Sequence, residues 1–118
     1  KESLELTDED LGLVRLAVRN AETKGVIITC GTDAMTTVAL AMQRDLGPEL
    51  RTAVVVTGAF IPGRYDTSEA CFNLGAAWTA AKVLPPAVYL VMGGEIFDPR
   101  EVVKDVQTRQ FVNRNWHL

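Results

Sequence analysis

The chain has 118 residues, 47% of them hydrophobic, which is enough for one domain with a buried core. Twelve Lys and Arg against 15 Asp and Glu give a net charge of -3 with no basic cluster, which argues against a nucleic-acid partner. No apolar run approaches the roughly 18 residues that cross a bilayer, and no stretch reads as a secretory signal. His117 is the sole histidine, which argues against a Ser-His-Asp site or a multi-histidine zinc site.

The first predicted elements are a helix and a strand. Apolar residues recur at helical spacing over residues 8–22, after Thr7 as the N-cap and acidic residues in the first turn. We expect Gly25 to end this helix. Residues 26–30 form a continuous, largely β-branched apolar run, which is typical of a buried parallel strand.

The pattern of helix and strand repeats twice more. A helix begins near Met35 and ends at Gly47-Pro48, and a strand follows over residues 52–57. A loop over residues 59–68 leads to a helix over 69–82, for which Ser68 is the expected cap. We expect Phe72 and Trp78 of this helix to lie in the core, and a third strand over residues 87–92.

The last part of the chain has a different pattern. Residues 95–100 read as a short strand and turn, and residues 101–104 as the second strand of a hairpin. Residues 105–118 form a polar tail that is either a docked arm or partly ordered. The alternation of elements predicts an α/β fold, a doubly wound (flavodoxin-like or Rossmann-like) parallel sheet with helices on both faces and a C-terminal β-hairpin. Because three parallel strands make a thin sheet, we expect a missing N-terminal strand or completion by a partner.

The turn Gly31-Thr32-Asp33 follows the first strand. In open α/β sheets, ligands bind beyond the carboxyl ends of the strands, so Thr32 and Asp33 would face such a crevice. The alternative interpretation is that one of them merely caps the next helix, which is the commoner role for these residue types.

A hydroxyl nucleophile needs a base, and in a chain with one histidine a lysine can serve. Thr32, Asp33 and Lys104 are the right types for a relay in which the carboxylate orients the amine. Lys104 taken alone is more often a solvated surface lysine. Sequence leaves open whether the three meet.

The remaining motifs argue against a cofactor. No Gly-x-Gly-x-x-Gly follows a strand, and no phosphate-binding Gly-Lys-Ser/Thr loop is present, so we expect no nucleotide. Cys30 and Cys71 lack metal-ligand spacing, and we expect no metal. Both cysteines read as buried, reduced thiols, which favours a cytoplasmic location.

Several segments resemble motifs of the bacterial-type L-asparaginases in order and approximate spacing. The sequence ITCGTDAM at residues 28–35 resembles the family's second active-site motif, and REVVK at 100–104 resembles the segment with its catalytic lysine. Further similar segments are SLELTD at 3–8, VVTGAFIP at 55–62 and FNL at 72–74. The resemblance is closest to the short members that have a single, N-terminal-type domain, and it implies one such domain over residues 1–118.

The resemblance implies an amidohydrolase that converts the side-chain amide of L-asparagine, or a related small amide, to L-aspartate and ammonia through a threonine acyl-enzyme. It implies Thr32, Asp33 and Lys104 as catalytic residues, with Lys104 as the base. It implies Ser3, Gly31, Thr32 and Asp33 as substrate-binding residues, and backbone N–H groups near Gly31 as oxyanion donors. It also implies a homo-oligomer, expected to be a dimer, because family sites form between subunits.

The sequence departs from the family pattern at several positions. The family's first motif, Thr-Gly-Gly-Thr-Ile, belongs to a strand before Ser3, and we expect that strand and its nucleophile loop to be missing from this chain. Leu4 replaces a glutamine, Cys30 a common histidine, Ile61 an arginine, and Asp105 a threonine or asparagine. These departures support the alternative of a non-catalytic domain that binds an acidic amino acid or serves assembly.

Overall fold

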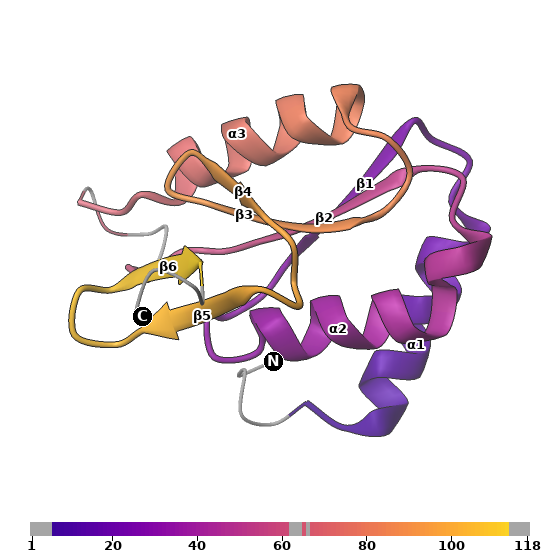
Figure 1. The fold of residues 1–118 in the computed structure, drawn as a ribbon, viewed down its shortest axis with the longest axis horizontal. Coiled ribbons are helices and arrows are strands. Elements are labelled where there is room, and N and C mark those ends of the chain that lie inside the picture. The colour runs from indigo at the N-terminus through magenta and orange to yellow at the C-terminus, as the bar shows by residue number, and fades with distance from the viewer. Residues whose placement is uncertain (1–5, 62–64, 66, 114–118) are drawn as a thin grey trace.

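The computed structural model describes residues 6–61, 65 and 67–113 (Figure 1). In chain order its elements are α1 (Asp8–Asn20), β1 (Gly25–Thr29), α2 (Met35–Leu46), a short 3-10 helix (Gly47–Glu49), β2 (Ala53–Thr57), α3 (Ala70–Val83), β3 (Val88–Met92), β4 (Glu95–Phe97), β5 (Val102–Asp105) and β6 (Gln110–Asn113). The three predicted parallel strands each lie within one residue of their observed bounds.

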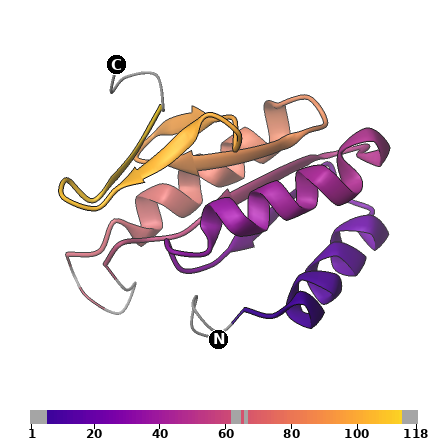
Figure 2. The same cartoon turned by 60° about the horizontal axis from the view of Figure 1, so that its bottom comes forward.

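The main sheet has the order β1-β2-β3-β4. Strands β1 to β3 run parallel, with Ile27 opposite Val55 and Val55 opposite Tyr89, and β4 pairs antiparallel with β3. Helices α1 and α2 lie on one side of the sheet and α3 on the other (Figures 1 and 2). The predicted doubly wound α/β fold is confirmed. All five residues of β2 are buried, as expected for a strand covered on both faces.

Helix α3 packs on the sheet through small side chains. Its buried positions are Asn73, Ala77, Ala80 and Ala81. This narrow stripe leaves Phe72 and Trp78 on the outer side, 62% and 58% exposed. The prediction that these two aromatic residues lie in the core is therefore wrong. A helix that contacts the sheet through alanines comes too close for large side chains on that face.

Two predicted helix ends also need correction. The capping box of α1 is confirmed: the Thr7 hydroxyl accepts from the Asp10 N–H, and the Asp10 carboxylate accepts from the Thr7 N–H. However, α1 ends at Asn20, because Ala21 is already extended, and Gly25 begins β1. Ser68 lies one residue before Glu69, the N-cap of α3, although its hydroxyl accepts from the Ala70 N–H.

The C-terminal hairpin is confirmed, but its strands differ from those predicted. Gly93 and Gly94, both with positive φ, turn β3 into β4, so residues 95–97 belong to the main sheet. The partner of β5 is β6, in the segment predicted as a polar tail. Alternation in β6, where Phe111 is buried between half-buried and exposed neighbours, explains why that segment forms a strand. Trp116 and His117 lie outside the described residues.

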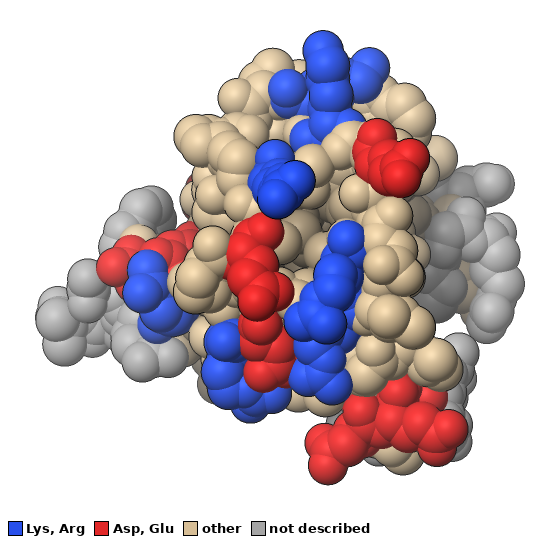
Figure 3. Space-filling view, turned by 90° about the vertical axis from the view of Figure 1, so that its right-hand side faces the viewer, with Lys and Arg blue, Asp and Glu red and all other residues tan. Residues whose placement is uncertain are grey.

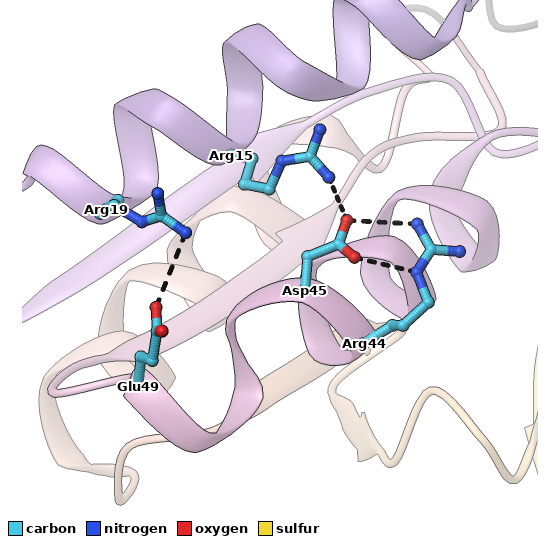
Figure 4. Close-up of polar contacts among 5 residues, drawn as sticks. All are labelled: Arg15, Arg19, Arg44, Asp45 and Glu49. Carbon is cyan, nitrogen blue, oxygen red and sulfur yellow. Dashed lines mark hydrogen bonds and ion pairs between the residues drawn. The ribbon is translucent and has the colours of Figure 1, made fainter.

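Ion pairs link α1 to the end of α2 and to the short 3-10 helix that follows it (Figure 4). Arg15 contacts Asp45, and Arg19 lies 3.6 Å from Glu49. Hydrogen bonds from Arg44, and then from Arg15, hold the pKa of Asp45 below its usual value. Figure 3 shows this end of the molecule, away from the carboxyl ends of the parallel strands, with acidic and basic side chains next to one another.

Within the described residues, no helix combines the length and apolar character needed to cross a membrane.

Candidate functional site

The turn after β1 directs two polar side chains away from the helix that follows. The Gly31 carbonyl accepts from the Ala34 N–H at 3.0 Å, which closes the turn, and Ala34 is the N-cap of α2. No side chain caps this helix, so the interpretation of Thr32 or Asp33 as a mere N-cap is wrong. Their side chains instead contact Lys104.

The ends of β1 and β2 are held together tightly. The Cys30 N–H donates to the Thr57 carbonyl at 3.1 Å. A Cβ at Gly58 would lie 2.3 Å from the Cys30 carbonyl oxygen, so only a glycine lets the two backbones approach this closely. This close packing fixes the start of the Gly31-Thr32-Asp33 turn against the loop after β2.

Lys104 reaches the turn from β5. The register places it opposite Phe111, and it shares a face of the strand with Val102; both of these residues are buried. The lysine therefore points inward and is not the solvated lysine that its residue type alone suggests. Its side chain is 23% exposed.

Thr32, Asp33 and Lys104 form one cluster, as the relay hypothesis requires. Lys104 Nζ lies 2.9 Å from Thr32 Oγ1 and 2.5 Å from Asp33 Oδ1. The Asp33 side chain is 57% exposed, so water screens part of its attraction to the ammonium group. An amine, a hydroxyl and a carboxylate in this arrangement can move a proton between the threonine and the lysine while the aspartate fixes the amine.

Sequence reasoning missed the residues that hold the loop after β2. Asn73, 1% exposed, donates to the Gly58 carbonyl at 2.9 Å and accepts from the Gly93 N–H at 3.1 Å. The Glu69 carboxylate accepts from the N–H groups of Phe60 and Ile61, both at 3.0 Å. A signal for Asn73 was present, because it continues the buried small-residue stripe of α3 by one turn. No sequence pattern distinguishes Glu69.

A shallow pocket of about 200 Å³ lies next to this loop. Its lining includes Phe60, Glu69, Asn73, Gly93 and Phe111. The pocket thus lies beyond the ends of β2 and β3, where ligands of open α/β sheets bind.

The other predicted site residues divide into two groups. Gly31 is exposed and adjoins the Thr32, Asp33 and Lys104 cluster, whereas Ser3 lies outside the described residues. Within the described part of the chain, no group of three or more His, Cys, Asp and Glu residues is arranged to hold a metal ion.

The two cysteines have different environments. Burial raises the pKa of the Cys30 thiol to about 11, so this group stays protonated near neutral pH. Cys71 is exposed, which corrects the prediction that both thiols are buried. Cys71 is a residue of α3 but lies outside its buried stripe of small residues, so its thiol faces solvent.

Comparisons with known proteins identify the family of this chain and support its fold. The family model described as Asparaginase, N-terminal, matches residues 1–112. Two similar solved structures each cover 96% of this chain: the thermostable L-asparaginase from Thermococcus kodakarensis (27% identity, TM-score 0.86) and L-asparaginase I from Vibrio cholerae O1 biovar eltor str. N16961 (26% identity, TM-score 0.84). This chain covers 35% of each of those proteins. A search of curated proteins gave no match. The chain belongs to the asparaginase family and corresponds to its N-terminal part.

Proposed function

We propose that this chain supplies the proton relay of an asparaginase-like amidohydrolase. The observation that carries the proposal is the position of Lys104 Nζ, 2.9 Å from the Thr32 hydroxyl and 2.5 Å from the Asp33 carboxylate. The substrate class is the side-chain amide of L-asparagine or a related small amide. Membership of the asparaginase family supports this assignment.

The proposed reaction has two stages. In the first, a threonine hydroxyl attacks the amide carbon, an ester bond forms, the C–N bond breaks and ammonia leaves with a proton. In the second, water attacks the ester and releases the carboxylic acid and the threonine. The attacking threonine is that of the family's Thr-Gly-Gly-Thr motif, which precedes Ser3 in the family order.

Within this chain, Lys104 acts as the base. With its amine neutral, Lys104 Nζ is placed to accept the proton of Thr32 Oγ1 while Thr32 Oγ1 accepts the proton of the attacking hydroxyl. The relay returns this proton to the leaving nitrogen, which departs as ammonia. Asp33 Oδ1 keeps the amine directed at the threonine, and this exposed carboxylate is available to bind the α-ammonium group of an amino acid. The N–H groups at Gly31 are proposed oxyanion donors, and Ser3 a ligand of the α-carboxylate.

Ammonia release from L-asparagine tests the proposal. The enzyme to use is a polypeptide in which the family's Thr-Gly-Gly-Thr strand precedes Ser3. Thr32→Ala and Lys104→Met should each lower kcat by about a hundredfold or more, because each removes a member of the relay. Lys24→Met, a change at an exposed lysine, is the control and should leave kcat unchanged. Full activity of either relay variant would contradict the proposal.

A second candidate function is binding of an acidic amino acid without turnover. The observation that favours it is Cys30 next to the Gly31 turn, where the family commonly has a histidine: with a pKa of about 11 this thiol does not titrate near neutral pH. Calorimetry would then detect L-aspartate binding while no ammonia forms. Hydrolysis by the polypeptide described above would exclude this candidate.

The assembly and location are also proposals. We propose that residues 1–118 form a single N-terminal-type domain, that the complete protein is a cytoplasmic homodimer, and that no cofactor takes part. Sedimentation tests the dimer, and a monomer at high concentration would contradict it. Cell fractionation tests the location, and recovery of the protein outside the cytoplasm would contradict it.

A further inference from the structure

Phe60 belongs to the loop after β2 and contacts the hairpin that carries Lys104. Its ring is 5.7 Å from the ring of Phe111, measured between centroids, at an interplanar angle of 43°. Lys104 Nζ lies 5.4 Å from the centroid of the Phe60 ring. Since Lys104 and Phe111 are cross-strand partners, the Phe60 ring contacts both members of one pair.

The backbone of Phe60 is fixed independently of its ring. The Glu69 carboxylate accepts from the N–H groups of Phe60 and Ile61, and Ser68 Oγ donates to the Ile61 carbonyl at 2.5 Å. Glu69 and Ser68 immediately precede α3, so the loop is attached to the start of a helix that packs on the sheet. The backbone that carries the ring is therefore anchored to the start of α3 by hydrogen bonds.

We propose that Phe60 is the positioning residue for Lys104. Its ring provides an electron-rich surface for the ammonium group and a packing surface for Phe111, so that the hairpin docks with Nζ directed at Thr32. In this proposal Phe60 acts through Lys104 and the hairpin that carries it, and the inference rests on the proposed function in taking Lys104 as the base.

The polar contacts of Lys104 do not by themselves fix its position, so the aromatic contact contributes to placing it. Lys104 has two polar partners on the turn, and Asp33 is exposed and partly screened, so this ion pair alone holds the flexible lysine weakly. The hairpin forms a sheet separate from the main one, and Val102 and Phe111 join the core beside Phe60. Without the aromatic contact, the hairpin and the lysine lose a packing partner, and a displacement of Nζ by about 1 Å is enough to slow proton transfer by up to about a hundredfold.

The test compares Phe60→Leu, Phe60→Tyr and Phe72→Leu in the 118-residue chain. Phe72→Leu is the matched control, because Phe72 is 62% exposed on the outer side of α3. The readout is the NMR cross-peak between the Lys104 Hε protons and the Thr32 methyl group, which reports their proximity without any need for hydrolysis.

The expected result is loss of most of the cross-peak intensity in Phe60→Leu, with retention in Phe60→Tyr and Phe72→Leu. If Phe60→Leu does not fold, Glu69→Gln tests the inference in its place, because it weakens the hydrogen bonds that hold the Phe60 backbone without removing the aromatic ring. In Glu69→Gln the cross-peak between Lys104 and Thr32 should weaken. Wild-type intensity in a folded Phe60→Leu, or in Glu69→Gln where that variant decides, would overturn the inference.

Kinetics separate this inference from the proposed function. In the polypeptide with the Thr-Gly-Gly-Thr strand, Phe60→Leu should lower kcat about tenfold or more with KM nearly unchanged, and Phe60→Tyr should restore it. If the cross-peak depends on Phe60 while Lys104→Met leaves ammonia release unchanged, the proposed function fails and the positioning role stands. If Lys104→Met abolishes release while Phe60→Leu keeps both the cross-peak and kcat, the positioning role fails alone.

Discussion

Asn73 provides a quantitative test of how the site is held together. Its buried side chain bridges the Gly58 carbonyl and the Gly93 N–H, and thereby ties the loop after β2 to the turn after β3. Asn73→Ala removes both hydrogen bonds. It leaves the half-buried Gly58 carbonyl without this partner, at a cost of about 1–2 kcal/mol, and the exposed Gly93 N–H, which water can reach, at about 0.5–1 kcal/mol. The cavity adds about 1 kcal/mol, for a total of about 3 kcal/mol.

Urea denaturation followed by circular dichroism measures this loss. For a chain of this length, 3 kcal/mol corresponds to a fall in Tm of roughly 12 °C. Asn20→Ala is the matched control, since Asn20 is exposed at the end of α1, and we expect its stability to change by about 0.5 kcal/mol or less. A loss below about 1 kcal/mol for Asn73→Ala would refute the bridging role, because it would mean that the two loops are held by other contacts.

Three further predictions concern other parts of the chain. Burial raises the pKa of the Cys30 thiol from 9.0 to about 11, so the unfolded chain loses this proton at a lower pH than the folded chain does. In urea titrations, the stability of wild type relative to Cys30→Ala should therefore fall as the pH rises from about 9 to about 11. A difference that stays constant over this range would contradict the prediction. Hydrogen bonds from Arg44 and Arg15 lower the pKa of Asp45, so the unfolded chain binds this proton at a higher pH than the folded chain does. The free energy of unfolding of wild type relative to Asp45→Asn should therefore decrease as the pH falls below about 4. An increase in that range would be inconsistent with the ion pair. Arg109 has a φ of 54°, a strained value for any residue other than glycine. Arg109→Gly should therefore raise the free energy of unfolding by about 0.5–1 kcal/mol in the same assay. A decrease would show that the arginine side chain stabilises the hairpin.

The layers of the fold were predictable because the signals are local. Runs such as 53–57 are apolar and β-branched, and glycine or polar residues follow each of them, so strand positions come from sequence alone. The partner of β5 was not predictable in the same way. Residues 95–97 and 110–113 are both short and mixed, and the choice between them depends on the two-glycine turn after β3, which joins the first segment to the main sheet.

The candidate site was predictable in part for a related reason. The resemblance to the asparaginases points to Thr32, Asp33 and Lys104, and the geometry brings these three together. Their supports are Phe60 and Glu69. Phe60 acts through contacts with a hairpin that is far away along the chain, and Glu69 through hydrogen bonds to the loop that holds Phe60. The spacing of residues along the chain does not reveal such contacts. The burial of α3 was mispredicted at Trp78 because the few polar residues of this mostly apolar helix do not gather on one face, so its sequence does not reveal its orientation.

The most direct test of the central claim is a crystal structure of the chain at a resolution that defines the Lys104 side chain. The account predicts Lys104 Nζ within hydrogen-bond distance of both Thr32 Oγ1 and Asp33 Oδ1, near the 2.9 Å and 2.5 Å found here. A structure in which β5 is ordered and Lys104 extends into solvent, away from the Gly31-Thr32-Asp33 turn, would contradict it.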